Sequence, residues 1–391
     1  IIMNKVIIDK QKERNREVAS MLKNSDSSIT NLRLISLGNS IASGYSMVRT
    51  IKPLLLRNDS IESIMKEYDI RLERYHFARA QNNNDEHIFE WLVSNITENE
   101  MHDMNRSDYS GGASSMVTHE LTPAKIERYY PYKENDNKGL RDLALDNNPN
   151  IANIIVYNGC TGSFLDAATR NGKLTQQLMS GVNRDTVGLE SVLKYIQTNN
   201  RTNYGNTQVY VCGAPNFLGL GISELINRKL KKIAKNYANV SYVEPVKSKF
   251  FYKPLEDFNE EFELSMLQTI FKEYIYQADI HYDEKEYLKF NNNIMKTIRD
   301  NYEINNSMIG IDRQMCELNH SLEVKYPELI GDEAVPDMID AIVLEETKKI
   351  SSQEKKDKLL KRANSYLINR SPYDYFYVGK KNIKESFQKG K

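Results

Sequence analysis

The sequence predicts a three-layer α/β/α protein built on a sheet of about five mainly parallel strands. Short apolar runs of strand length alternate with segments of helical periodicity, and long connections separate successive runs. Parallel strands need such crossover connections, whereas antiparallel strands can be joined by tight hairpins. The repeated order of strand, helix and strand therefore favours helices on both faces of one sheet.

Five apolar runs are the expected strands: 32–37, 70–76, 151–157, 207–213 and 240–243. Helical patterns occupy the connections at 41–55, 86–97, 185–198 and 221–237. Apolar residues at helical spacing predict an outer helix over 3–24, and charged helices are expected at 284–302, 338–349 and 353–367.

We expect three regions along the chain. Residues 1–29 form an N-terminal helix, and residues 30–302 form the α/β domain with a helical insertion at about 250–278. Residues 303–391 form a helical C-terminal extension, whose aromatic stretch at 371–377 is expected to dock back on the body.

The charge balance makes several partners unfavourable. Lys plus Arg number 53 and Asp plus Glu number 53, so there is no net attraction to nucleic acid or to an anionic membrane. No apolar run approaches the roughly 18 to 20 residues of a membrane span, and the first residues lack the order of a signal peptide. We expect a soluble chain, cytoplasmic as it stands or secreted if a signal was removed. Its Asn, Lys and Ile bias favours a bacterial source, and the oligomeric state stays open.

Metal and cofactor signals are weak. The three cysteines, Cys160, Cys212 and Cys316, are too few and too scattered for a disulfide framework or a cysteine zinc site. The six histidines are dispersed and none belongs to a His-Glu-x-x-His motif. We therefore expect no metal and no other cofactor.

The most informative stretch is residues 34–44, LISLGNSIASG, where an apolar run stops at Gly38-Asn39-Ser40 and a helical pattern begins. A serine between a strand and a helix has an exposed hydroxyl and lies near the positive end of a helix dipole, where an oxyanion is stabilised. The same residues also suit an ordinary turn or helix N-cap. The glycine spacing excludes a P-loop, a dinucleotide fingerprint and a Gly-x-Ser-x-Gly elbow. Ser40 is thus a candidate nucleophile of another architecture.

A serine nucleophile needs a base and a group that orients that base. His281 is the best placed histidine, because it follows the last strand–helix unit in the carboxylate-rich segment Ala278-Asp279-Ile280-His281-Tyr282-Asp283. The other five are expected to be structural or exposed: His76, His87, His102, His119 and His320.

Together these residues resemble the SGNH or GDSL-type hydrolases, which are serine esterases, lipases and acyltransferases with a flavodoxin-like α/β/α fold. The resemblance covers about residues 30–302. Leu37-Gly38-Asn39-Ser40 is similar to the nucleophile block, with Asn in place of the usual Asp, and implies that Ser40 is the nucleophile. The segment 109–115 is similar to the second block. It implies that the backbone N–H of Gly112, or of Gly111, joins that of Ser40 in the oxyanion hole.

Two blocks depart from the family pattern. Alignment of the third block on Gly159 puts Thr161 where the family has Asn, so the third oxyanion donor is either Asn158 or the hydroxyl of Thr161. In the last block, Asp-x-x-His, position 278 is Ala. Three arrangements stay open there: Asp279 orients His281, a backbone carbonyl orients it in a Ser-His dyad, or Ala278 replaces an original Asp.

The resemblance implies a serine hydrolase that cleaves a carboxylic ester through an acyl-enzyme on Ser40. Because His281 must be neutral to act as the base, activity is expected to rise with pH through the titration range of histidine. The favoured substrate is an O-acyl group on a glycan or a small molecule, with a lipid second. The alternatives are an acyltransferase that uses the same serine, and a binding or scaffold protein of this fold that has lost catalysis.

Overall fold

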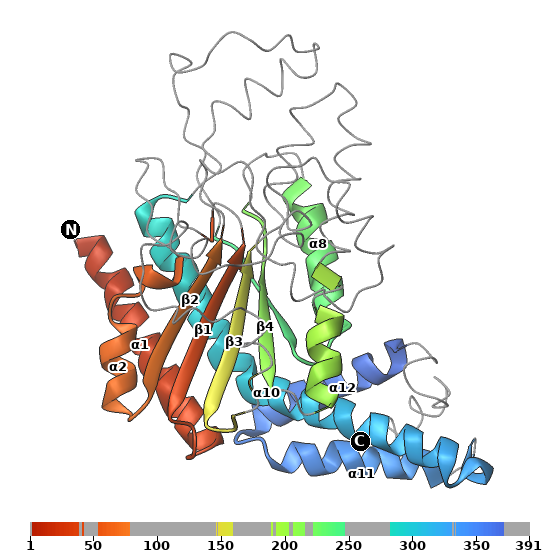
Figure 1. The fold of residues 1–391 in the computed structure, drawn as a ribbon. Coiled ribbons are helices and arrows are strands. Elements are labelled where there is room, and N and C mark those ends of the chain that lie inside the picture. Colours follow the sequence, from red (N-terminus) through yellow and green to blue (C-terminus); the bar gives the residue numbers. More distant parts are fainter. Residues whose placement is uncertain are drawn as a thin grey trace, which may run out of the picture.

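A computed structural model describes residues 2–38, 41–42, 54–78, 146, 148–158, 189–190, 193–202, 206–215, 222–246, 282–330, 332 and 334–370. A sheet of five parallel strands forms its middle layer (Figure 1). The strands are β1 (Asn31–Gly38), β2 (Arg71–Ala78), β3 (Ile151–Asn158), β4 (Thr207–Cys212) and β5 (Val240–Val243). Their order, β2-β1-β3-β4-β5, is that of flavodoxin-like sheets, and the expected fold class is confirmed.

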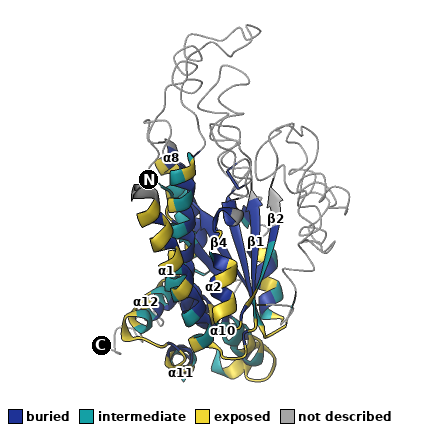
Figure 2. Cartoon of the chain, turned by 90° about the vertical axis from the view of Figure 1, so that its left-hand side faces the viewer, coloured by how far each residue is buried: buried dark blue, intermediate teal, exposed yellow. Residues whose placement is uncertain are grey.

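The strands are apolar along their whole length because helices cover both faces of the sheet. All six residues of β4 are buried, and in β3 only Ile151 is partly exposed. Figure 2 shows β1 and β4 in dark blue between more exposed helices. Successive side chains of a strand point to opposite faces, so Leu34 and Ile154 contribute to one layer of the core and Ile35 and Ile155 to the other.

One face of the sheet carries α1 (Ile2–Ser25), α2 (Ile61–Glu67), the short 3-10 helix η1 (Leu54–Arg57) and the first half of α10 (Glu284–Val324). Their apolar side chains form one cluster with this face, as Leu22 of α1, Leu34 of β1 and Phe290 of α10 illustrate. The other face carries α8 (Ile222–Lys235), where Lys231 lies over the ring of Tyr242 in β5.

The helix α10 is 41 residues long and joins the sheet to the C-terminal helices without a break. Its start is fixed by a capping box, in which Asp283 accepts a hydrogen bond from the Glu286 backbone and Glu286 accepts one from the Asp283 backbone. Its second half packs with α11 (Ala334–Lys348) and α12 (Gln353–Asn369) around a second apolar cluster. The expected limit between domain and extension, at 302/303, therefore falls inside a continuous helix.

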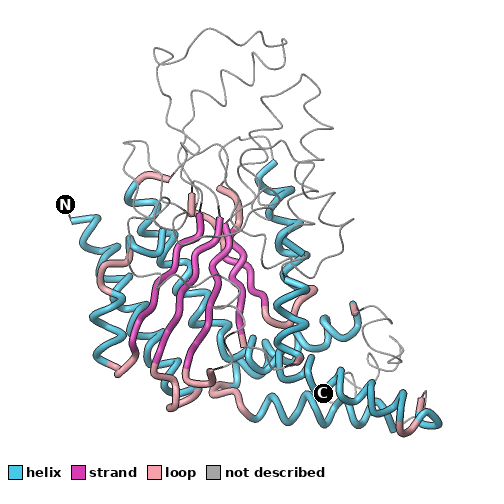
Figure 3. The backbone as a smooth tube through the Cα atoms, viewed as in Figure 1, coloured by secondary structure: helices cyan, strands magenta, loops and turns pink. Residues whose placement is uncertain are grey.

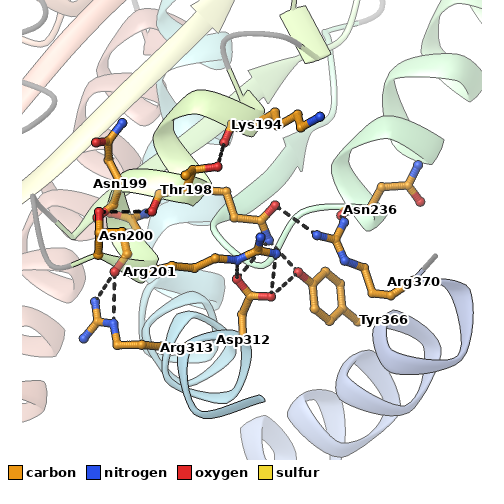
Figure 4. A network of polar contacts seen from close by, with 12 residues as sticks. Lys194, Thr198, Asn199, Asn200, Arg201, Asn236, Asp312, Arg313, Tyr366 and Arg370 are labelled. Atoms are coloured by element: carbon orange, nitrogen blue, oxygen red, sulfur yellow. Dashed lines mark hydrogen bonds and ion pairs between the residues drawn. The ribbon is translucent and has the colours of Figure 1, made fainter. Parts of the chain in front are cut away.

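A buried carboxylate ties the C-terminal helices to the sheet domain (Figure 4). Asp312 of α10 accepts two hydrogen bonds from Arg201, at 2.6 Å and 3.0 Å, and one at 2.8 Å from the hydroxyl of Tyr366 in α12. Arg201 belongs to the helical residues 193–201 in the connection between β3 and β4. If one of the three helical segments moved away, the buried Asp312 charge would lose a donor, which is costly. The carboxylate therefore favours one arrangement of residues 193–201, α10 and α12.

Two helices differ from expectation. Within the expected helix at 41–55, residues 41–42 form a turn and η1 begins at Leu54, directly after Pro53, which cannot donate a backbone hydrogen bond inside an α-helix. The short α2 was not expected, and it is stabilised by burial of Ile61, Ile64 and Met65. The expected helix at 86–97, the insertion at 250–278 and the aromatic stretch at 371–377 lie outside the described residues.

Among the helices of the described ranges, none is both long enough and apolar enough to cross a membrane.

An ion pair near the amino-terminal ends of β1 and β2 makes the stability of the fold depend on pH. Buried Arg33 donates to Glu73 at 3.2 Å and to Asp146 at 2.9 Å, and Asn31 donates to Glu73 at 2.9 Å. Burial alone would raise the pKa of Glu73, but the charge of Arg33 and hydrogen bonds from Arg33, Asn31 and Tyr75 bring it below its ordinary value. The folded state therefore favours the ionised carboxylate.

We predict that Glu73→Gln lowers the free energy of unfolding by about 1 to 3 kcal/mol at neutral pH. Because the folded pKa is depressed, the wild-type advantage is present above the unfolded glutamate value of about 4.3 and is lost as pH falls through the lower folded value. Urea unfolding at neutral and acid pH measures this. The control Glu62→Gln removes a mostly exposed carboxylate and should change stability by less than about 0.5 kcal/mol. An advantage of wild type over Glu73→Gln that is the same at both pH values would contradict the prediction.

Candidate active site

The carboxyl edge of the sheet is where this fold forms sites. All five strands end at this edge, toward the top of Figure 3. The chain adds β2 on one side of β1 and β3 on the other, so the strand order reverses between β1 and β3, and ligands bind at such a switch point. Gly38, the last residue of β1, is paired in register with Asn158, the last residue of β3. In the sequence, Ser40 follows Gly38 by two positions.

Asn158 carries an unusual side chain for a buried position. The residue is 2% exposed, and its amide nitrogen Nδ2 has no hydrogen-bond partner among the described residues. A buried donor without a partner costs about 1 to 3 kcal/mol, so this amide is one of several buried polar groups that leave a hydrogen bond for water or a bound molecule to make. The amide stands at the end of the strand beside the one that leads to Ser40.

A second buried polar group lies on the neighbouring strand. Ser36 of β1 is 1% exposed, and its hydroxyl also has no hydrogen-bond partner within the described part of the chain. Ser36 pairs with Val156, two positions before Asn158, so the alternation of side chains puts Ser36 and Asn158 on the same face of the sheet. The sequence interpretation missed Ser36, although a serine inside the run Leu34-Ile35-Ser36-Leu37 is a detectable signal.

The exit of β4 is fixed by close backbone contacts. A Cβ atom on Gly213 would lie 2.1 Å from the hydroxyl oxygen of Tyr242 and 2.8 Å from Cδ of Pro245, so no larger residue fits there. The Asn227 side chain accepts a hydrogen bond from the Ala214 backbone N–H at 2.7 Å and donates to the Ala214 carbonyl at 3.0 Å. These contacts hold the carboxyl end of β4 against β5 and α8.

The residue after His281 is anchored at this same edge. Tyr282 is fully buried in the cluster that contains Cys212 and Val243, the last residues of β4 and β5. Its hydroxyl accepts a hydrogen bond from the Val246 backbone N–H at 3.2 Å and donates to the Val246 carbonyl at 3.3 Å. Burial raises the pKa of Tyr282 well above its ordinary value, so its hydroxyl keeps its proton at neutral pH.

The start of α10 is also clamped to the connection that follows β1. The buried side chain of Arg57, at the end of η1, forms an ion pair with Glu284 and lies 4.5 Å from the ring centre of Tyr287. Burial lowers the pKa of Arg57, although the nearby Tyr287 and Asp59 oppose that shift. The amide of Asn291 donates to the Leu54 carbonyl at 2.7 Å. The segments after β1 and at the start of α10 therefore lie side by side.

Of the predicted site residues, Asn158 lies within the described ranges. The others lie outside the described residues: Ser40, Gly111, Gly112, Thr161, Asp279 and His281. The structure therefore fixes three points of the chain. They are the end of β1, two residues before Ser40, the end of β3, which is Asn158 itself, and the start of α10, three residues after His281.

The described residues offer no group of three or more His, Cys, Asp or Glu side chains that could hold a metal ion. Cys212, at the end of β4, is buried, and burial raises the pKa of its thiol, which keeps it protonated and unreactive at neutral pH. The chemical group that this edge of the sheet provides is therefore a buried amide donor, Asn158 Nδ2, at the carboxyl end of β3.

Comparisons of the chain with protein-family models, with curated proteins and with solved structures found no match.

Two buried asparagines of β3 allow a matched test of the amide. The Nδ2 of Asn153 donates to Thr207 Oγ1 at 2.7 Å, whereas the Nδ2 of Asn158 has no partner in the described structure. We predict that Asn158→Leu leaves the free energy of unfolding unchanged or raises it, because it removes a buried donor that nothing satisfies. Asn153→Leu should lower it by about 1 to 3 kcal/mol. Urea unfolding of both variants measures this, and an equal loss in the two would mean that the Asn158 amide has a structural role.

Proposed function

We propose that this chain is a serine hydrolase of the SGNH type, which cleaves a carboxylic ester through an acyl-enzyme on Ser40. The observation that supports this most is the buried amide of Asn158, which has no hydrogen-bond partner among the described residues and ends the strand next to the one that leads to Gly38-Asn39-Ser40. A donor that is already desolvated and held in place can stabilise the charge that develops on a carbonyl oxygen in the transition state.

In the proposed reaction, His281 takes the hydroxyl proton of Ser40 as the serine oxygen attacks the ester carbonyl carbon. The carbonyl electron pair moves to oxygen, which accepts hydrogen bonds from the backbone N–H groups of Ser40 and Gly112 and from the side chain of Asn158 or Thr161. The alcohol leaves with the proton from His281. A water molecule, deprotonated by the same histidine, then attacks the acyl carbonyl carbon. The bond between that carbon and Ser40 Oγ breaks as the histidine returns the proton to Ser40, and the acid is released.

The described contacts favour Asp279 as the group that orients His281. Asp283 and Glu286, which follow the histidine, hydrogen-bond each other's backbone N–H groups in the capping box of α10, and Glu284 is paired with Arg57. These three carboxylates are therefore engaged at the start of the helix. Asp279 is the nearest carboxylate before the histidine, and a backbone carbonyl in a Ser-His dyad is the alternative.

The proposed substrate is an O-acyl group on a glycan or a small molecule, with a lipid ester second. The equal numbers of acidic and basic residues favour neither a nucleic acid nor an anionic membrane as the partner. An acyltransferase would use the same serine and differ in the acceptor that attacks the acyl-enzyme.

A fluorophosphonate probe, which labels activated serines, tests the proposal. We predict one covalent adduct on the wild-type protein by intact mass spectrometry, and none on Ser40→Ala. The matched control is Ser36→Ala, which removes the buried hydroxyl on β1 and should keep the adduct, because Ser36 is 1% exposed and out of reach of the probe.

Absence of labelling in folded wild-type protein would contradict the hydrolase and favour a binding or scaffold protein of this fold. Labelling that survives in Ser40→Ala would assign the nucleophile to another residue. If the wild-type protein is labelled, an assay of unreacted protein with an added alcohol or glycan acceptor separates hydrolysis from acyl transfer. A transferase forms the new ester faster than it forms the free acid.

A further inference from the structure

A polar cavity of about 410 Å³ lies at the opposite, amino-terminal edge of the sheet. It is lined by the end of α1, the segments that lead into β3 and β4, the middle of α10 and the end of α11. The predicted catalytic residues do not contribute to it. A volume of this size is typical of a small-molecule site.

Two buried glutamates line this cavity, Glu303 of α10 and Glu346 of α11, with side chains 5% and 3% exposed. One oxygen of each is satisfied. Glu303 Oε2 accepts from Ser351 at 3.0 Å and from Lys355 at 2.8 Å. Glu346 Oε1 accepts from Gln314 at 2.6 Å and from Lys349 at 2.8 Å.

The second oxygen of each carboxylate accepts no hydrogen bond from the described residues. A carboxylate has about four acceptor positions. Neither of these second oxygens is among the fully buried polar atoms without a partner, so each is accessible to a further donor. Glu303 and Glu346 line the cavity, and each therefore keeps one oxygen that can accept from a further donor; Glu303 also lines a second pocket with Ser351 and Lys355.

The helix geometry gives the separation of the two carboxylates. Glu346 lies against α10 at Gly310, where a Cβ atom would be 2.5 Å from its carboxyl carbon. Glu303 is seven positions earlier on the same helix, which is about two turns and about 10 Å along the axis. Residues seven apart share one face of a helix. The two acceptors are thus spaced along a single groove wall.

The cations that line the cavity are already engaged. Arg313 donates to the Asn200 carbonyl at 2.7 Å and 3.0 Å and to Asn206 Oδ1 at 2.9 Å, and Lys349 is paired with Glu346. Asp26 adds a further acidic side chain to the lining. Apolar side chains complete the wall at Ile29, Ile151 and Ile309.

We propose that this cavity binds a linear alkyl diamine of the class of 1,4-diaminobutane and 1,5-diaminopentane. One ammonium group donates to the open oxygen of Glu303 and the other to that of Glu346, while the methylene chain lies along the apolar side chains. A divalent metal ion fits less well, because it needs several converging ligands and the described residues bring no three acidic, His or Cys side chains together. The ligand would join α10 to α11.

Isothermal titration with 1,5-diaminopentane and with 1,4-diaminobutane at constant ionic strength tests the proposal. Wild type should bind at least one of them saturably, and binding should raise the melting temperature because the ligand occupies only the folded state. Butylamine, with a single ammonium group, should bind at least about tenfold more weakly, since it forms one charge-assisted contact instead of two.

Glu303→Gln and Glu346→Gln should each weaken diamine binding by about tenfold or more. The matched control is Glu345→Gln, which removes an exposed carboxylate on α11 paired with Lys348 and should bind like wild type. Circular dichroism checks each variant for folding, and if Glu346→Gln does not fold, Glu303→Gln alone decides. No saturable binding of either diamine to wild type would overturn the proposal. So would equal affinities in wild type, Glu345→Gln and the folded cavity variants.

Discussion

The packing of α10 across one face of the sheet is the constraint on which the described structure depends. The helix starts at a capping box beside the carboxyl edge of the sheet, and Phe290, Ile294 and Ile298 are buried in the cluster that also holds α1 and the strands. Farther along, Asn305 donates to the Gln208 side chain of β4 and accepts from Ser241 of β5, both at 3.0 Å. Because these polar groups are buried, a shift of the helix by one turn would break several hydrogen bonds at once.

This single helix connects two chemically different ends of the molecule. At the carboxyl edge its first residues are clamped to the connection after β1 and hold the chain that follows the proposed base. At the amino-terminal edge its middle residues line the acidic cavity, and Asp312 fixes the positions of the C-terminal helices. A ligand that joins α10 to α11 would therefore act on the same helix that positions the proposed active site.

The strands could be predicted from the sequence because burial on both faces turns each of them into a short apolar run. The run at 240–243 coincides with β5, and the other four agree within two residues at each end. The length of α10 could not be predicted in the same way. Its polar residues Glu303, Asn305 and Asp312 are buried in specific contacts, so the simple alternation of apolar and polar faces breaks down after residue 302.

The candidate site was predictable in part. The end of the first strand and the asparagine at the end of the third are local signals, and the structure brings Gly38 and Asn158 into register. The lack of a partner for the Asn158 amide depends on residues far away in the chain, which no local pattern reveals. The same holds for the cavity, whose Asp26, Glu303 and Glu346 come from three separate parts of the chain: the residue after α1, the helix α10 and the helix α11.

We propose that the Asn158 amide is an oxyanion donor for a serine nucleophile at position 40. The most direct measurement is the crystal structure of the protein after reaction with a fluorophosphonate. We expect the phosphorus on Ser40 Oγ and a phosphoryl oxygen within about 2.7 to 3.1 Å of Asn158 Nδ2. An adduct on Ser40 whose phosphoryl oxygens all lie beyond about 3.5 Å from that nitrogen, with Asn158 bonded to protein instead, would contradict it.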